Sequence, residues 1–267
     1  MAITSNDAIE ERRKEIQRRR KEQKLKRKKA AVRRLVIFVC ILMVITLALL
    51  SLTVFFPVTK ITVENNNTVY SAEQIIKASG VEKGKNLWMT GFNAEKDIPL
   101  KLPFISEAKV QRKFPSTVII TPTPAKAVYS VQYKNEYYLC DEEYKLLEIK
   151  KETDKNLISV VGIEPEKTKV GNKVVFKDEE KLKMLTVIID GLKQKSITLN
   201  SLDVTELMEI MVRVESRFNV YFGSSAYLDM KIAHLSGMIK ESEKDVVGSI
   251  DLTDYTPENG KGILTRE

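Results

Sequence analysis

The residues best suited to nucleophilic or metal chemistry are a single histidine, His234, and two cysteines, Cys40 and Cys140. A Ser-His-Asp or Cys-His catalytic site would have to use His234, because the chain has no second imidazole. These three residues are also too few for the usual zinc site. We therefore expect no catalytic residue, no metal, no cofactor and no disulfide framework. His234 is interpreted as a structural residue, and Cys140 as a buried strand residue, with a reactive thiol as the alternative.

Two acidic clusters, Asp141-Glu142-Glu143 and Asp178-Glu179-Glu180, could supply a pair of carboxylates. A glycosidase needs two carboxylates that face each other across a cleft. The first cluster lies between two strand-like runs and is typical of a turn. The second opens a segment with an apolar stripe, where acidic residues complement the positive end of a helix dipole. The sequence also lacks a glycine-rich phosphate loop, so it does not indicate an enzyme.

Residues 35–56 form an uninterrupted apolar run of 22 residues without a charge, glycine or proline. At about 1.5 Å per residue, a helix of this length covers roughly 33 Å, which is enough to cross the hydrocarbon core of a bilayer. A cleaved signal peptide is the alternative, but its apolar stretch is usually shorter. We predict a permanent transmembrane helix over residues 35–56.

The positive charge of the chain is concentrated before this run. The whole chain has 44 Lys and Arg against 36 Asp and Glu, and residues 1–34 hold 14 of the basic and five of the acidic residues. The remainder is nearly neutral, so no nucleic-acid partner is expected. Because basic residues favour the cytoplasmic side, we expect residues 1–34 to be a cytoplasmic tail and residues 57–267 to lie outside the membrane.

Residues 57–126 contain two strand patterns that flank helix signals. Ser71 and Gln74 have the spacing of a capping box, and Gly80 is placed to end that helix. Pro99 is tolerated best in a first helical turn, so a second helix is expected from Asp97 to Leu102. With strands at 58–63, 108–113 and 117–121, the expected order is β-α-α-β-β.

Residues 127–256 alternate short strand patterns with two amphipathic helices. Strands are expected at 128–131, 137–140, 146–149, 198–204, 209–214, 218–222 and 246–255. One helix begins at Asp178, and the apolar face of the other runs from Leu228 to Ile239. We expect a mixed α/β domain with an antiparallel-rich sheet, followed by a polar tail over residues 257–267.

Several motifs in this order resemble the FtsQ/DivIB bacterial cell-division proteins. They include Ile61-Thr-Val63, Gly84-Lys-Asn86-Leu87, and the stretch from Pro103 to Ile120 that contains Ala108-Lys-Val-Gln-Arg112. Val220-Tyr-Phe-Gly223 and Gly248-Ser-Ile-Asp-Leu252 carry the resemblance into the second half. Pro122 stands where the family usually has glutamate. The resemblance implies an α+β chain with a single N-terminal transmembrane helix, a POTRA domain at 57–126 and a β domain at 127–256.

The resemblance also implies a function. Such a protein would be a non-enzymatic divisome scaffold that binds FtsL-like and FtsB/DivIC-like single-span partners outside the membrane and helps control septal peptidoglycan synthases indirectly. It would be a single-pass protein of the cell membrane, enriched at the division septum. The alternative is a membrane-anchored, exported cell-wall hydrolase or transferase that acts through His234 or a carboxylate.

The candidate binding site is the edge of the last expected strand, because an unpaired edge can accept a partner strand. Alternation places Ile250 and Leu252 on one face. The alternative is an ordinary edge guarded by Asp251 and Asp254. The candidate residues on this strand are Ser249, Ile250, Asp251, Leu252, Thr253, Asp254 and Tyr255. A second candidate surface is the turn formed by Arg112, Lys113, Phe114 and Pro115, and its alternative is a solvated hairpin.

Overall fold

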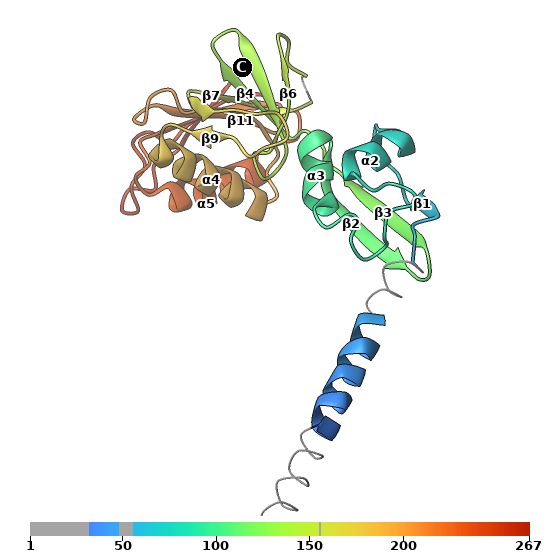
Figure 1. Cartoon of the computed structure of the whole chain (residues 1–267). Coiled ribbons are helices and arrows are strands. Elements are labelled where there is room, and N and C mark those ends of the chain that lie inside the picture. The colour runs from blue at the N-terminus through green and yellow to red at the C-terminus, as the bar shows by residue number, and fades with distance from the viewer. Residues whose placement is uncertain (1–31, 48–55, 155) are drawn as a thin grey trace, which may run out of the picture.

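The computed structural model describes residues 32–47, 56–154 and 156–267 (Figure 1). Residues 32–47 are helical, and their side chains are exposed. Residues 48–55 of the expected span, and nearly all of the basic tail, lie outside the described residues. Among the helices described, none has both the length and the apolar character needed to cross a bilayer. The membrane span and its orientation therefore stay predictions.

Residues 56–124 form a small sheet with two helices. Its strands are β1 (Lys60–Val63), β2 (Ile105–Lys113) and β3 (Thr117–Pro124), in the order β1-β3-β2. β3 pairs parallel with β1 and antiparallel with β2. The helices are α2 (Ala72–Ser79) and α3 (Ala94–Lys101). The expected β-α-α-β-β order is confirmed.

The ends of α2 follow from local sequence. The backbone N–H of Gln74 donates to the hydroxyl of Ser71 at 3.3 Å, and the N–H of Ser71 donates to the side-chain oxygen of Gln74 at 2.8 Å. Gly80 ends the helix with a φ of 66°, a conformation that glycine adopts without strain. The capping box and the glycine stop are confirmed.

The expected start of the second helix is wrong. α3 begins at Ala94 rather than Asp97, so Pro99 lies in the interior of the helix. Ala94 and Ile98 are both buried, and residues four apart lie on the same face of a helix. Their packing against the sheet outweighs the backbone hydrogen bond that Pro99 cannot donate.

Residues 129–266 form a second, larger sheet of nine strands. The strand order is β14-β13-β12-β11-β10-β7-β4-β5-β6. The expected α+β class is confirmed, and most neighbours are antiparallel; the parallel pairs are β4 with β7, β7 with β10, and β12 with β13. The strands are β4 (Tyr129–Tyr133), β5 (Glu136–Cys140), β6 (Leu146–Lys150), β7 (Ile158–Val161), β10 (Leu199–Asp203), β11 (Ile210–Val214), β12 (Phe218–Gly223), β13 (Gly248–Asp251) and β14 (Ile263–Arg266).

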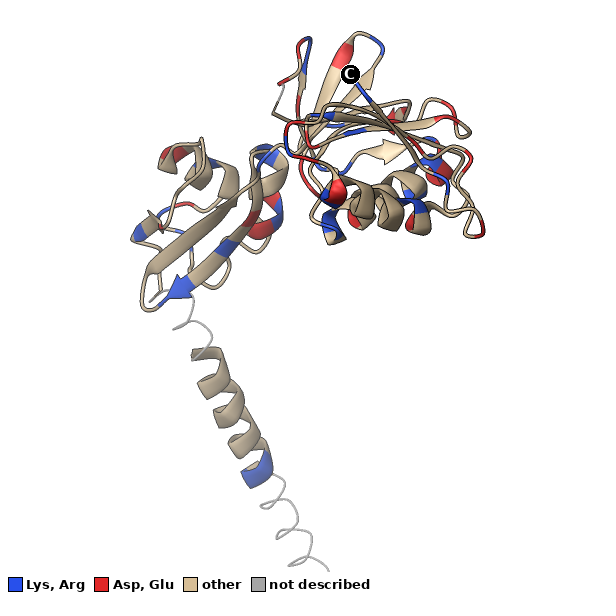
Figure 2. Cartoon of the chain, turned by 180° about the vertical axis from the view of Figure 1, so that it is seen from behind, with Lys and Arg blue, Asp and Glu red and all other residues tan. Residues whose placement is uncertain are grey.

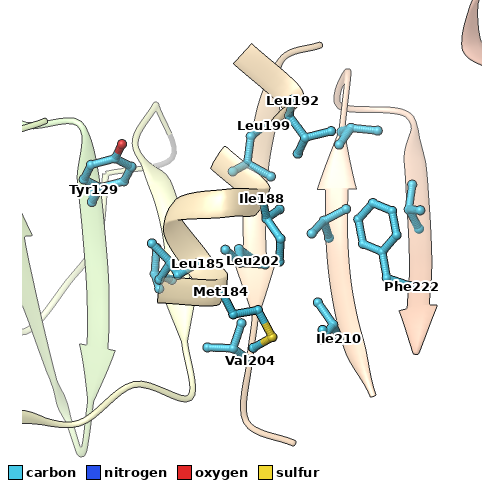
Figure 3. Close-up of a cluster of buried hydrophobic side chains, with 14 of the residues drawn as sticks. Tyr129, Met184, Leu185, Ile188, Leu192, Leu199, Leu202, Val204, Ile210 and Phe222 are labelled. Carbon is cyan, nitrogen blue, oxygen red and sulfur yellow. The ribbon is translucent and has the colours of Figure 1, made fainter. Parts of the chain in front are cut away.

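Two helices, α4 (Glu179–Gln194) and α5 (Leu228–Glu241), lie side by side on one face of this sheet (Figure 1). Leu185 and Ile188 of α4 point toward Leu202 of β10, and all three are essentially inaccessible to solvent (Figure 3). The core of this half therefore lies between the helices and one face of the sheet. The two-stranded hairpin of β8 (Pro165–Lys167) and β9 (Val175–Phe176) is separate from the sheet.

The main difference from expectation concerns the end of the chain. Residues 257–267 were expected to form a polar tail, whereas residues 263–266 form β14. β14 pairs antiparallel with β13, from Gly248 with Arg266 to Asp251 with Ile263. Strands β7, β8 and β9 were also not expected. This difference matters because it changes which strand is the edge of the sheet.

Candidate partner-binding surfaces

His234 makes a structural contact. It lies half-buried on α5, and its ring packs against Tyr255 with the ring centroids 5.2 Å apart. Within the described ranges, no three histidine, cysteine or acidic side chains are grouped so as to hold a metal ion. The acidic clusters have local roles: Asp141 accepts hydrogen bonds from the N–H groups of Glu143 and Lys145 in a turn, and Asp178 is the N-cap of α4.

Cys140 is buried at the end of β5 and has no exposed surface. Its Sγ lies 3.6 Å from the carbonyl oxygen of Tyr138. Burial, with a smaller contribution from Asp141, raises the pKa of the thiol from 9.0 to about 12. Because the thiolate is the reactive form, this environment favours the structural interpretation of Cys140.

We expect Cys140 to resist thiol reagents in the folded protein. In a Cys40→Ser variant of the full chain, modification at pH 8 should be at least about a hundredfold slower than in denaturant, because both access and thiolate formation are suppressed. The rate can be measured with a chromogenic disulfide reagent. Rapid modification of the native variant would support the reactive-thiol alternative.

One buried cation was missed by the sequence analysis. Lys231 is 1% exposed on α5, and its Nζ donates to the carbonyl oxygens of Phe222 at 2.6 Å and Ser224 at 3.1 Å. Burial lowers its pKa. The lysine thereby ties α5 to the segment that leaves β12. In the sequence, Lys231 lies beside Ile232 on the apolar face of the helix. This position was the only feature that could have indicated its burial.

The expected edge over Ser249–Tyr255 is not an edge. β13 ends at Asp251, and it lies between β12 and β14. The expected alternation is confirmed, because Ile250 and Leu252 are fully buried whereas Ser249 is half-buried and Asp251 is exposed. The remaining three residues follow the strand. Thr253 donates its N–H to Asp251, Asp254 pairs with Lys261 at 3.0 Å, and Tyr255 contacts His234. A role for these residues in partner binding stays a prediction.

The terminal edge of the sheet is formed by β14. The N–H of Glu267 donates to the carbonyl of Val247 at 3.0 Å. Because hydrogen-bonded and non-hydrogen-bonded pairs alternate in an antiparallel ladder, this bond shows which residues of β14 face β13. Ile263 and Thr265 then direct their backbone groups to β13, and Leu264 and Arg266 direct theirs away from it. No strand in the described part of the chain pairs with this outer side. β14 therefore offers the backbone edge that was expected on β13.

The face of the large sheet opposite the helices carries polar and amphipathic side chains. Met211 of β11 and Tyr221 of β12 are about two-fifths exposed, and Arg213 lies beside them. A shallow hollow of about 350 Å³ lies over this part of the sheet. Ser249 and Asp251 pair with Asn219 and Tyr221, so they extend this face toward β14.

The second candidate surface, the turn between β2 and β3, is tied to a neighbouring loop. Arg112 donates from Nε to the carbonyl of Leu87 at 3.0 Å and from Nη2 to that of Thr90 at 2.9 Å, and its guanidinium lies over the ring of Phe92. Phe114 packs against Trp88. Lys113 and Pro115 are exposed. The turn is therefore part of a larger surface, and the positive charge of Arg112 is directed to its own domain.

Known proteins resemble parts of this chain. A family model described as the POTRA domain, FtsQ-type, matches residues 56–121. The cell division protein DivIB of Clostridium acetobutylicum is 27% identical over 176 residues, which cover 65% of this chain and 68% of that protein. DivIB of Clostridium tetani is 25% identical over 195 residues, covering 71% and 72%. The cell division protein FtsQ of Corynebacterium glutamicum is 20% identical over 205 residues, covering 74% and 87%.

Proposed function

Since the chain is a relative of the FtsQ/DivIB cell-division proteins, as its motifs predicted, we propose that it is a membrane-anchored scaffold of the division machinery. In this proposal it binds FtsL-like and FtsB/DivIC-like single-span proteins outside the membrane and catalyses no reaction itself. Through these partners it helps control septal peptidoglycan synthesis. The observation that carries the proposal is the outer edge of β14 at the end of the nine-stranded sheet.

The membrane anchor is supported by the apolar run at residues 35–56 and by the basic residues before it. In the described part of this run, large apolar side chains such as Leu35 and Phe38 are more than half exposed on a helix that touches no core. Apolar surface of this extent is stable only when a lipid or a protein covers it. A bilayer is the environment that fits a run apolar on all sides.

The docking mode is supported by the backbone geometry of β14. An added strand would receive hydrogen bonds from the N–H groups of Leu264 and Arg266 and donate to their carbonyl oxygens. Both residues are at least partly exposed, so a partner can approach without displacing the core. Partners held in the same membrane meet this edge at a raised effective concentration, and a short strand addition then suffices for capture.

We expect Leu264→Pro to weaken capture of the single-span partners about fivefold in a membrane pull-down, which corresponds to about 1 kcal/mol. Proline removes the outward N–H, and its ring occupies the space of the incoming strand. The hydrogen bonds between β14 and β13 are donated by the neighbouring residues and remain. Leu264→Ala is the matched control, because it shortens the same side chain and keeps the N–H. Equal capture by wild type and both variants would contradict docking on this edge.

A further inference from the structure

An exposed aromatic patch lies on the smaller domain. We define it as Trp88, Met89, Phe92 and Phe114. Their side chains are 46%, 71%, 72% and 51% exposed, respectively. Leu87 takes the buried position in this loop, whereas the adjacent Trp88 points outward. Four large apolar side chains gathered on one surface indicate an interaction site rather than scattered exposure.

The patch adjoins the point where the apolar run ends. The N–H of Leu87 donates to the carbonyl of Phe56, and the N–H of Val58 donates to the carbonyl of Lys85, both at 2.8 Å. The rings of Phe56 and Phe114 meet edge to face, with their centroids 5.8 Å apart. Phe56 is the last residue of the run expected to cross the membrane. The patch is thus fixed beside the end of the segment that is expected to cross the membrane.

The patch is held in place by buried and hydrogen-bonded groups. Leu87 is fully buried beneath it, and Arg112 ties the loop to β2 through the carbonyls of Leu87 and Thr90. The rings of Trp88 and Phe114 pack against each other with their centroids 5.0 Å apart and their planes tilted by 49°. The aromatic side chains are therefore exposed on a folded surface, and not on a loose loop.

Basic residues border the patch. Lys113 is exposed at the tip of β2, where Figure 2 shows blue at the head of the strand, and Lys60 and Lys85 are exposed on the adjoining segments. Lys85 has one acidic neighbour, Glu82, at 3.9 Å. Aromatic rings bordered by lysine are typical of protein surfaces that lie at the headgroup level of a membrane.

We propose that the aromatic patch inserts into the interfacial layer of the outer membrane leaflet and docks the smaller domain on the lipid surface. This inference rests on the proposed membrane anchor. Lipid is favoured over a protein partner because a chain segment advances at most about 3.6 Å per residue, and the patch contacts Phe56 directly. Docking would fix the orientation of the domain, so that the large sheet is presented to membrane partners at a defined height.

The experiment uses Trp88 as a probe, because it is the only tryptophan of the chain. The full chain is reconstituted in vesicles of phosphatidylcholine with a minority of phosphatidylglycerol. The acyl chains are brominated either near the carbonyl end or at mid-chain. We expect the shallow bromines to reduce Trp88 fluorescence about twofold and the deep ones to reduce it less. Equal fluorescence in brominated and unbrominated vesicles would overturn the proposal.

A matched pair of variants tests whether the patch itself is responsible. Met89→Gln with Phe92→Gln removes exposed apolar side chains, so Trp88 quenching should fall. Val69→Gln changes a side chain that is 77% exposed elsewhere in the domain and should leave quenching unchanged. Val69 lies away from the patch. Its neighbour Tyr70 accepts a hydrogen bond from the N–H of Phe104, just before β2 begins, whereas Phe114 follows the other end of β2.

Resistance of the chain to alkaline extraction from the vesicles separates the two proposals. If the chain resists extraction but Trp88 is not quenched, the membrane anchor is present and the docking of the patch is overturned. If the chain is extracted, it has neither the anchor nor the docking, and the membrane anchor of the proposed function is overturned as well.

Discussion

Replacing Ile250 by glutamate is expected to lower the free energy of unfolding of the large domain by about 5 kcal/mol, through the loss of a packed aliphatic side chain and the burial of a charge. Ile250 is fully buried on β13, where it lies opposite Val220 of β12 and Leu264 of β14. A loss of this size is comparable with the whole stability of many domains. Urea denaturation followed by far-ultraviolet circular dichroism measures it.

Ser249→Glu is the control for this change. Ser249 is on the same strand but faces away from α4 and α5 and is half-buried, so its substitution should change the free energy of unfolding by no more than about 0.5 kcal/mol. Trp88 lies in the smaller domain, and its fluorescence should follow an unchanged transition in both variants. Unfolding of Ile250→Glu at the wild-type urea concentration would show that the register of β13 is wrong.

This expectation changes how a binding experiment at β13 is interpreted. Sequence alternation indicated that Ile250 and Leu252 share a face, but it did not say that both are inaccessible in the core. Charged substitutions there would abolish partner capture by unfolding the sheet, whatever surface the partner uses. Variants at Leu264 avoid this problem, because that side chain is only partly buried at the outer strand.

Local signals in the sequence were sufficient to predict where α2 and α4 begin. The capping box at Ser71 and the N-cap at Asp178 each depend on residues within one turn, so their spacing alone determines the helix start. Pro99 shows the limit of local reasoning. Its helix begins earlier than the proline suggests because Ala94 and Ile98 pack on the sheet, and sequence near Pro99 does not reveal that sheet.

The candidate site was harder to predict because it depends on pairing between distant segments. β14 has only four residues, and its sequence shows no strong alternation. Its conformation comes from hydrogen bonds to β13, across a connection that includes Gly260 and Gly262. The aromatic patch was missed for a related reason, since the sequence does not show which of two adjacent residues, Leu87 or Trp88, faces the core.

Gly248→Ala is expected to detach β14 from β13. A Cβ atom at Gly248 would lie 2.0 Å from the carbonyl oxygen of Thr265 and 3.1 Å from Cα of Arg266. Both are backbone atoms, so rotation of a side chain cannot relieve the contact. The amide of Thr265 faces β13, and its protection from hydrogen exchange should fall about a hundredfold. Amides in β12 should keep their protection, because β14 contributes little to the core.

Gly237→Ala is the matched control, because a Cβ atom there meets nothing within 4 Å. Without β14, the backbone groups of Ser249 and Asp251 become the edge of the sheet. If partners pair with the outer side of β14, as proposed, Gly248→Ala reduces their capture and Gly237→Ala does not. Increased capture by Gly248→Ala would show instead that β14 covers the binding strand and that a partner has to displace it. That result would assign the docking edge to β13, where the sequence first indicated it.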